Sequence, residues 1–211
     1  MRFTHLTSKD YVVSNWSGGK TIQIAIAPEG AVYADRDFLW RVSSATADLD
    51  ESDYTPLPDY ERWLSVFDRP IRLQHDGGEV ITLNPYGIHC FDGGAATRSW
   101  GRCVDFNLML RKGKAEGSLQ AVLLSGGQTL EPQGADTMLL YCAEGSGMVG
   151  EISLKAEEAV LVQDVKEDTV TVTGRGKFML SRMKGEISVL PPTGGDDKKG
   201  YINYYGNQDG H

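Results

Sequence analysis

Two arginines lie in or beside short strand-like segments whose apolar neighbours would bury them. Arg41 lies in mid-strand between Trp40 and Val42, and Arg62 comes directly before the strand-like run that begins at Trp63. A buried guanidinium needs a partner, because an uncompensated charge in apolar surroundings is costly. That partner is either an internal carboxylate or the carboxylate of a bound ligand, which the planar guanidinium fork can hold through two hydrogen bonds.

Asp105 and Asn107 are the candidates for the complementary wall. They alternate with apolar residues in Val104-Asp105-Phe106-Asn107, so both side chains would share one face of their strand. Two interpretations of the charges remain open. In one, Arg41 and Asp105 form a structural ion pair; in the other, the arginines receive an anionic ligand.

Metal chemistry and nucleophilic catalysis have weaker support. The four histidines, His5, His75, His89 and His211, are far apart in sequence, whereas a metal site needs three or four converging donors. His75 and His89 are therefore predicted to be ordinary strand or turn residues. No nucleophile elbow is present, and Ser17–Thr21 lacks the full phosphate-loop pattern. We expect no catalytic residue, no metal and no cofactor.

Composition limits the possible partners and location. The chain has 211 residues, a formal net charge of -8 and 25 glycines. The acidic balance argues against nucleic acid and against an anionic membrane surface. We expect no signal peptide, because the first eleven residues hold no apolar run, and no stretch of the chain reaches the ~18 consecutive apolar residues that a membrane span needs. Cys90, Cys103 and Cys142 form no paired pattern, which indicates free thiols in a reducing compartment. A bacterial-type cytoplasmic protein fits these features.

The elements that would position these residues are strands. Strand-like runs separated by turn residues are typical of an all-β sandwich or barrel, whereas alternating βαβ units are not visible. The one plausible helical piece lies near 59–63. Strand-like runs cover 21–27, 38–44, 63–67, 71–75, 79–83, 104–110, 119–124, 138–143, 160–163, 169–173 and 178–182.

A weak internal repeat predicts two similar halves. Residues 63–83 and 139–154 each read as a strand, an acidic turn, a second strand, a glycine-containing turn and then Ile-Thr-Leu or Ile-Ser-Leu. Two copies of a small antiparallel roll, as in cupin-type jelly rolls, fit this pattern. Glycine-rich segments 113–118 and 125–136 could link them. We predict an N-terminal half over 1–115, a C-terminal half over 116–190 and a Gly/Tyr-rich tail over 191–211.

Several segments together resemble the HutD/Ves family, and their order and spacing carry the resemblance. They are Trp16-Ser17-Gly18-Gly19 with Thr21 and Ile24, Phe38-x-Trp40-Arg41-Val42-Ser43-x-Ala45, Tyr54-x-x-Leu57-Pro58-x-Tyr60-x-Arg62, Phe91-Asp92-Gly93 and Asp105-Phe106-Asn107-Leu108-Met109. The architecture would match over roughly residues 5–190, and all of these motifs lie before residue 112. The resemblance implies a bicupin, two tandem jelly-roll β-barrels in one chain, without the usual cupin metal ligands.

The resemblance also implies a function and a site. Family members are linked to histidine utilisation, so a regulatory protein that binds a small carboxylate such as N-formylglutamate, formate or urocanate is expected. The implied pocket is lined by Trp40, Arg41, Ser43, Pro58, Arg62, Asp105, Asn107 and Met109. Two alternatives stay open. One is a cupin-type, isomerase-like enzyme acting on a small anion; the other is an interaction protein that uses its acidic surface and tyrosine-rich tail. A homodimer is a further expectation.

Overall fold

The computed structural model describes residues 1–185, which form sixteen strands and one short 3-10 helix. In the N-terminal part the elements are β1 (Arg2–Leu6), β2 (Val12–Trp16), β3 (Gly19–Ala27), η1 (Tyr33–Asp35), β4 (Trp40–Ala47), β5 (Glu51–Asp53), β6 (Tyr60–Val66), β7 (Ile71–His75), β8 (Val80–Leu83), β9 (His89–Asp92), β10 (Thr97–Trp100) and β11 (Cys103–Arg111). The remaining strands are β12 (Ala115–Leu130), β13 (Thr137–Val149), β14 (Ile152–Lys155), β15 (Ala159–Gln163) and β16 (Val170–Gly185).

The predicted all-β class is confirmed, but the helical piece predicted near 59–63 is wrong. Residues 60–66 form β6, in which Leu64 and Val66 pack in one core and Tyr60 in a neighbouring one on the same face of the strand, while Trp63 packs against a core on the opposite face. This alternation has the period of two that belongs to a strand, and a helix would have placed these side chains differently.

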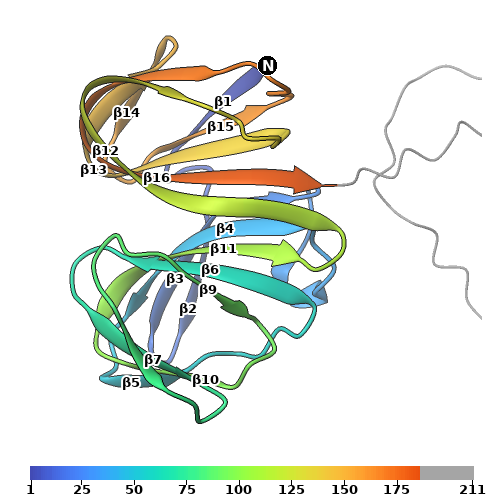
Figure 1. Ribbon diagram of the computed structural model, residues 1–211, viewed down its shortest axis with the longest axis vertical. Coiled ribbons are helices and arrows are strands. Elements are labelled where there is room, and N and C mark those ends of the chain that lie inside the picture. The colour runs from blue at the N-terminus through green and yellow to red at the C-terminus, as the bar shows by residue number, and fades with distance from the viewer. Residues whose placement is uncertain (186–211) are drawn as a thin grey trace, which may run out of the picture.

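The N-terminal half, β2 to β11, consists of two facing sheets (Figure 1). One sheet has the order β2-β3-β4-β11-β6-β9 and the other has the order β5-β10-β7-β8. Leu64 and Val66 of β6 pack against Ile71 and Leu73 of β7 between them. The hydrogen-bond pairing of the described residues closes neither sheet on itself, so this half is an open roll.

The C-terminal half is a single sheet, β1-β15-β13-β16-β12 with β14 on β13, that curls around its own core (Figure 1). Fifteen buried apolar residues, among them Met138, Leu154 and Phe178, fill its interior. The opposite face of this sheet packs on the N-terminal half, where Leu139 and Met179 join Val42, Phe106 and Leu108 in a second core. Burial of this shared apolar surface holds the two halves together.

β12 is the first strand after β11 that pairs in the C-terminal sheet, and two segments pair in ways that their sequence positions did not suggest. Arg2–Leu6, placed in the N-terminal half by its sequence position, forms β1 and pairs with β15 of the C-terminal sheet. Residues 125–130, predicted as part of a linker, continue β12 and pair with β16. Glycines in this stretch are accommodated within a long paired strand. The predicted tail over 191–211 lies outside the described residues.

The strand pairing repeats between the halves. In the first half β6 pairs with β9 and β11, and β7 pairs with β8 and β10. In the second half the single strand β13 makes the corresponding pairings with β15, β16 and β14. In the first half β4 also pairs with β11, and β5 pairs with β10. In the second half the single pair of β12 with β16 corresponds to both of these pairs. Long continuous strands in one half correspond to broken strands in the other.

Within residues 1–185, no helix has the length and hydropathy needed to cross a membrane.

Candidate anion-binding site

Six of the eight predicted site residues lie together on the face of β4, β11 and β6 that looks into the N-terminal half. On β11, Met109 lies between Arg41 of β4 and Arg62 of β6. Two residues along, Asn107 lies beside Ser43. Side chains two residues apart on a strand share a face, so Asp105 follows on the same side. Arg41 and Arg62 are thus two strand spacings apart, about 10 Å between backbones.

Arg41 is buried and held in place by neutral partners. Its Nε donates to Gln23 Oε1 at 2.8 Å, and its Nη1 donates to Ser43 Oγ at 3.1 Å. The guanidinium carbon lies 4.2 Å from the centre of the Tyr33 ring. Burial lowers the pKa of Arg41 to about 10, and Tyr33 partly offsets this effect. Arg41 therefore remains a cation at neutral pH.

Arg62 is buried to 7% exposure and has no comparable partners. Among residues 1–185 no ion pair within 4.0 Å reaches it, and its Nε has no hydrogen-bond partner. Two aromatic rings support it instead, with Tyr54 at 4.9 Å and Phe91 at 5.4 Å from the guanidinium carbon. Such contacts stabilise a cation but leave its N–H donors free. Burial lowers the pKa of Arg62 from its usual value.

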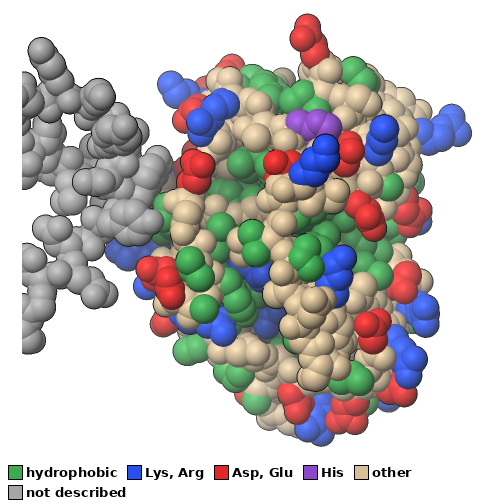
Figure 2. Space-filling view, turned by 180° about the vertical axis from the view of Figure 1, so that it is seen from behind, with side chains coloured by type: hydrophobic (Ala, Val, Ile, Leu, Met, Phe, Trp, Pro, Cys, Tyr) green, Lys and Arg blue, Asp and Glu red, His purple; other side chains and the backbone are tan. Residues whose placement is uncertain are grey.

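A third arginine lies beside Arg41 on a shared tyrosine ring. Arg36 follows η1 in the left-handed conformation, and its guanidinium carbon lies 4.2 Å from the same Tyr33 ring that Arg41 contacts. The buried Nη1 of Arg36 also has no partner in the described part of the chain. Arg36, Arg41 and Arg62 are called the arginine cluster below. Figure 2 shows basic side chains recessed in a hollow of the lower, N-terminal half, with apolar side chains around them.

Asp105 does not neutralise this cluster through direct contact. Within the described residues, no ion pair of 4.0 Å or less joins its carboxylate to Arg41 or Arg62. The interpretation of Arg41 and Asp105 as a structural ion pair is therefore wrong, because Arg41 uses Gln23 and Ser43 instead. Burial raises the pKa of Asp105 to about 7, and the attraction of Arg62 and Arg41 only partly counteracts that rise. A fraction of this carboxyl is consequently neutral at physiological pH.

Two residues of the implied pocket lie elsewhere. Trp40 belongs to the core between the two halves, because neighbouring residues on a strand point to opposite faces and Arg41 takes the inner one. Pro58 is exposed at the rim, where it lines a hollow of about 320 Å³ with Asp92, Gly94 and Lys112. Lys112 Nζ donates to the Pro58 carbonyl and to Asp92 Oδ1, each at 2.7 Å.

Asn107 contributes a third unpartnered polar atom, after Arg62 Nε and Arg36 Nη1. The residue is 4% exposed, and its buried Oδ1 accepts no hydrogen bond from the described residues. Leaving a buried polar atom without a hydrogen bond costs about 1–3 kcal/mol, so a ligand that donates a hydrogen bond to this oxygen recovers binding free energy of that order. The interior thus offers unpaired donors on Arg62 and an unpaired acceptor on Asn107.

Sequence reasoning missed the aromatic supports of the cluster as functional residues. Tyr54 and Phe91 both occur in the segments that carry the family resemblance, which is the signal that could have found them. Position 93 of the same segment requires glycine for a structural reason, because a Cβ there would lie 2.7 Å from the carbonyl oxygens of Leu57 and Tyr60. That close approach fixes the strand end that carries Phe91. Tyr33 and Arg36 lie in a loop without such a signal.

His75 and His89, predicted as ordinary strand or turn residues, meet inside the N-terminal half. Their Nε2 atoms are 2.9 Å apart, and both rings pack against Phe91. Among residues 1–185 no group of three or more histidine, cysteine or acidic side chains is arranged to hold a metal ion.

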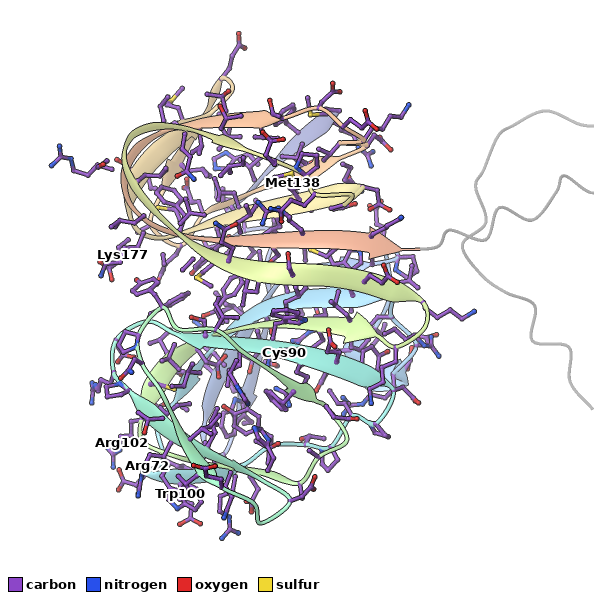
Figure 3. All side chains as sticks on the ribbon, in the orientation of Figure 1. Arg72, Cys90, Trp100, Arg102, Met138 and Lys177 are labelled. Carbon is purple, nitrogen blue, oxygen red and sulfur yellow. The ribbon has the colours of Figure 1, made fainter. Side chains whose placement is uncertain are left out.

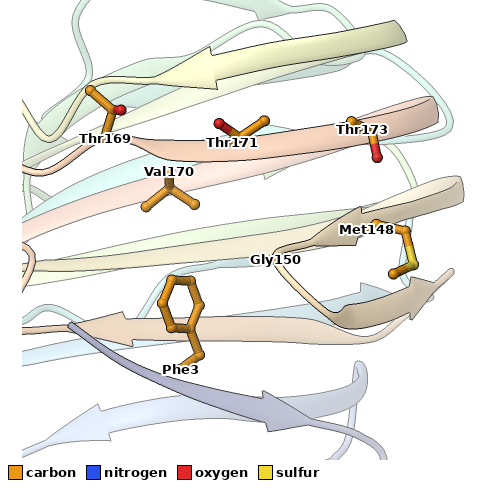
Figure 4. Close-up of a pocket in the computed structure, with 7 residues that line it drawn as sticks. All are labelled: Phe3, Met148, Gly150, Thr169, Val170, Thr171 and Thr173. Carbon is orange, nitrogen blue, oxygen red and sulfur yellow. The ribbon is translucent and has the colours of Figure 1, made fainter.

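The C-terminal half offers no comparable interior. Its buried arginine, Arg182, donates to the Glu131 carbonyl at 2.7 Å and to Gln120 Oε1 at 2.8 Å. Figure 3 shows Met138 among the side chains inside this half. A shallow groove of about 190 Å³ lies between β1 and β16, lined by Phe3, Met148 and threonines of β16 (Figure 4). No charged residue lines it, so the charged interior belongs to the N-terminal half.

The comparisons with known proteins agree with this arrangement. The profile of the HutD family matches residues 8–180. HutD from Pseudomonas fluorescens SBW25, solved in a formate condition, is 22% identical with a TM-score of 0.74, covering 88% of this chain and 100% of that one. PA5104 from Pseudomonas aeruginosa PAO1, described as a conserved protein of unknown function, is 20% identical with the same TM-score and coverage.

A more distant similarity extends to an enzyme. The formate complex of Lactobacillus farciminis oxalate decarboxylase is 7% identical with a TM-score of 0.58, covering 85% of each chain. Identities this low indicate a shared fold only. Comparison with curated proteins gives no significant match. Because the family profile spans most of the sequence, this chain belongs to the HutD family and has its cupin-like, all-β fold.

Proposed function

We propose that this protein binds a small carboxylate metabolite in its N-terminal half and thereby regulates histidine utilisation. N-formylglutamate, formate and urocanate are the candidate ligands, and no metal takes part. The observation that carries the proposal is the buried guanidinium of Arg62, whose Nε has no partner among the described residues. A carboxylate would accept its hydrogen bonds and neutralise its charge.

The charge balance of the interior supports an anion. Arg41 and Arg62 both act on the Asp105 carboxyl, whose raised pKa reduces its negative charge near neutral pH, and Arg36 adds a third positive charge beside Tyr33. The protein as a whole is acidic, with a net charge of -8, so the overall field does not attract the ligand. Recognition must therefore come from the local arginine cluster.

The same proposal includes a bicupin arrangement, in which each half is one jelly-roll unit. The repeated pairing of β6 to β11 and of β12 to β16 supports it. Under this proposal the first unit has kept a polar interior for the ligand, while the second unit has an apolar interior and serves as a support.

Isothermal titration calorimetry with N-formylglutamate, formate and urocanate tests the ligand. At least one of them should bind the unaltered protein, and Arg62→Gln should abolish that binding. Failure of all three to bind at millimolar concentration would contradict the ligand assignment.

Arg72→Gln is the matched control. Arg72 is also an arginine of the N-terminal half whose guanidinium contacts an aromatic ring, with Trp100 at 5.5 Å, but it is exposed. Figure 3 places Arg72 beside Trp100 at the lower end of the molecule. This variant loses the same charge from the same half, so it should bind the ligand as the unaltered protein does. An equal loss of ligand affinity in both variants would contradict a specific role of Arg62, because it would indicate an effect of net charge alone.

A second candidate is an isomerase-like enzyme, favoured by Asp105. A carboxyl group with a pKa near 7 beside buried arginines can take a proton from a carbon next to the carbonyl of a bound keto acid and return it. Incorporation of deuterium from the solvent into such a substrate, lost in Asp105→Asn, would support this reaction. Absence of exchange in a substrate that binds would exclude it for that substrate.

Location and assembly belong to the same proposal. We place the protein in the cytoplasm without a nucleic-acid or membrane partner, and a homodimer is its proposed assembly. The acidic net charge supports the first part. Light scattering in solution, which gives the mass of the assembly against 23.1 kDa for one chain, tests the second.

A further inference from the structure

His75 and His89 belong to a chain of hydrogen bonds from which we assign the positions of their protons. The Thr97 hydroxyl lies 3.2 Å from the Ala95 carbonyl and 2.8 Å from His75 Nδ1; with its one hydrogen assigned to the carbonyl, its oxygen accepts from His75 Nδ1. His75 therefore carries its proton on Nδ1 and presents a lone pair at Nε2. The 2.9 Å contact with His89 Nε2 then requires the proton to be on His89.

The orientation of the two rings favours a shared proton over a metal ion. Their planes differ by 20°, and their centres are 5.1 Å apart, which is the 2.9 Å contact plus the radius of each ring. The imidazoles consequently lie end to end in nearly one plane. Two histidines that bind one metal ion direct their lone pairs at a common point beside the N–N line, whereas these nitrogens point at each other.

The pair lies next to the arginine cluster, with Phe91 in contact with both. The Phe91 ring centre is 4.6 Å from that of His75 and 5.4 Å from the Arg62 guanidinium carbon. The charged groups that act on the pair are Arg62 of β6 and Asp76, which follows β7. Burial lowers the pKa of both histidines; Arg62 lowers the pKa of His75 further, and Asp76 opposes this.

We propose that the His75–His89 pair takes up a proton when a carboxylate binds to Arg62, so that ligand binding in this half is coupled to protonation. This inference rests on the proposed function. An anion on Arg62 cancels the positive charge that disfavours a second positive charge nearby. The protonated pair and the bound anion then stabilise each other, and the coupling must be reciprocal.

The direction of the pH dependence follows from this coupling. The pKa of the pair should be higher in the complex than in the free protein. Ligand affinity should then rise as the pH falls from the pKa of the complex to the pKa of the free protein, and it should be constant at lower pH. Each unit of difference corresponds to a tenfold gain in affinity. A bound anion would also favour protonation of Asp105. Total proton uptake on binding therefore cannot be attributed to the histidines, and their protonation must be measured residue by residue.

Nuclear magnetic resonance of the imidazole nitrogens, with formate as the probe, provides this resolution. The free protein should show His75 as the Nδ1–H form and His89 as the Nε2–H form. Excess formate should raise the titration midpoint of the pair, while His5, which contacts Glu158 in the other half, should not respond. His89→Gln assigns the signals and should reduce the pH dependence of formate affinity while Arg62 still binds formate.

The outcomes separate this inference from the function on which it rests. Formate binding with an unchanged midpoint for the pair overturns the coupling and leaves carboxylate binding intact. The opposite tautomers overturn the proton positions assigned to His75 and His89. If formate does not bind to the unaltered protein, formate is rejected as a ligand and the coupling is rejected with it.

Discussion

Replacing Arg62 with methionine should make the ligand-free protein more stable while it destroys anion binding. Methionine keeps much of the length and the apolar stem of the side chain but removes the charge. The loss consists of two cation–π contacts, with Tyr54 at 4.9 Å and Phe91 at 5.4 Å, worth about 0.5–2 kcal/mol each. The gain is the removal of a buried guanidinium without a counter-ion, whose desolvation costs several kcal/mol.

The net effect should be an increase of about 1–3 kcal/mol in the free energy of unfolding, since apolar replacement of buried charge commonly stabilises by this amount. Urea unfolding gives the value directly, and a chain of this length should gain about 2–4 °C in Tm per kcal/mol. In the unaltered protein, formate at a hundred times its Kd should add about 2.7 kcal/mol, and Arg62→Met should lose this addition.

Arg72→Met is the control for Arg62→Met, because that arginine is exposed and its replacement should change stability by no more than about 0.5 kcal/mol. A ligand-free Arg62→Met protein that is less stable by about 2 kcal/mol or more would contradict this expectation. It would mean that Arg62 has strong partners within the chain, as a structural residue does.

Three further predictions concern Asp105, Gly93 and the cysteines. Because burial raises the pKa of Asp105 to about 7 in the folded chain, the folded state holds its proton more tightly than the unfolded state. Stability should therefore fall as pH rises from about 4 to 7, and Asp105→Asn should flatten this decline in urea unfolding series at several pH values. Gly93→Ala should lower the free energy of unfolding by about 1–3 kcal/mol, because its Cβ would meet two carbonyl oxygens at 2.7 Å; an unchanged urea midpoint would contradict that clash. Cys103 and Cys142, which are both buried, should react slowly with a thiol reagent at pH 7 and rapidly in denaturant, since burial raises the pKa of the Cys103 thiol to about 12 and that of the Cys142 thiol to about 11; fast reaction of these two thiols in the folded protein would contradict this.

The sequence predicted the strands and one wall of the site because both depend on local alternation. Arg41, Asp105 and Asn107 alternate with apolar neighbours, and the structure places them on one inward face. The family resemblance assigns Trp40 to the pocket, although the same alternation turns it away from Arg41. The apparent helix near Asp59 failed because strand pairing on both sides overrides a weak local preference.

The remaining features depend on contacts between distant parts of the chain. His75 and His89 belong to different sheets, β7 and β9, and only the facing of those sheets brings their rings together. Arg36 reaches Tyr33 through a left-handed turn that no sequence pattern marks. The absence of an ion pair between Arg41 and Asp105 likewise depends on Gln23 of β3, which takes the Arg41 Nε hydrogen bond.

A crystal structure of the protein with formate would show whether Arg62 holds a carboxylate. We predict a formate carboxylate inside the N-terminal half, accepting a hydrogen bond from Arg62 Nε. Formate bound elsewhere on the molecule, with Arg62 Nε still unpaired, would contradict it.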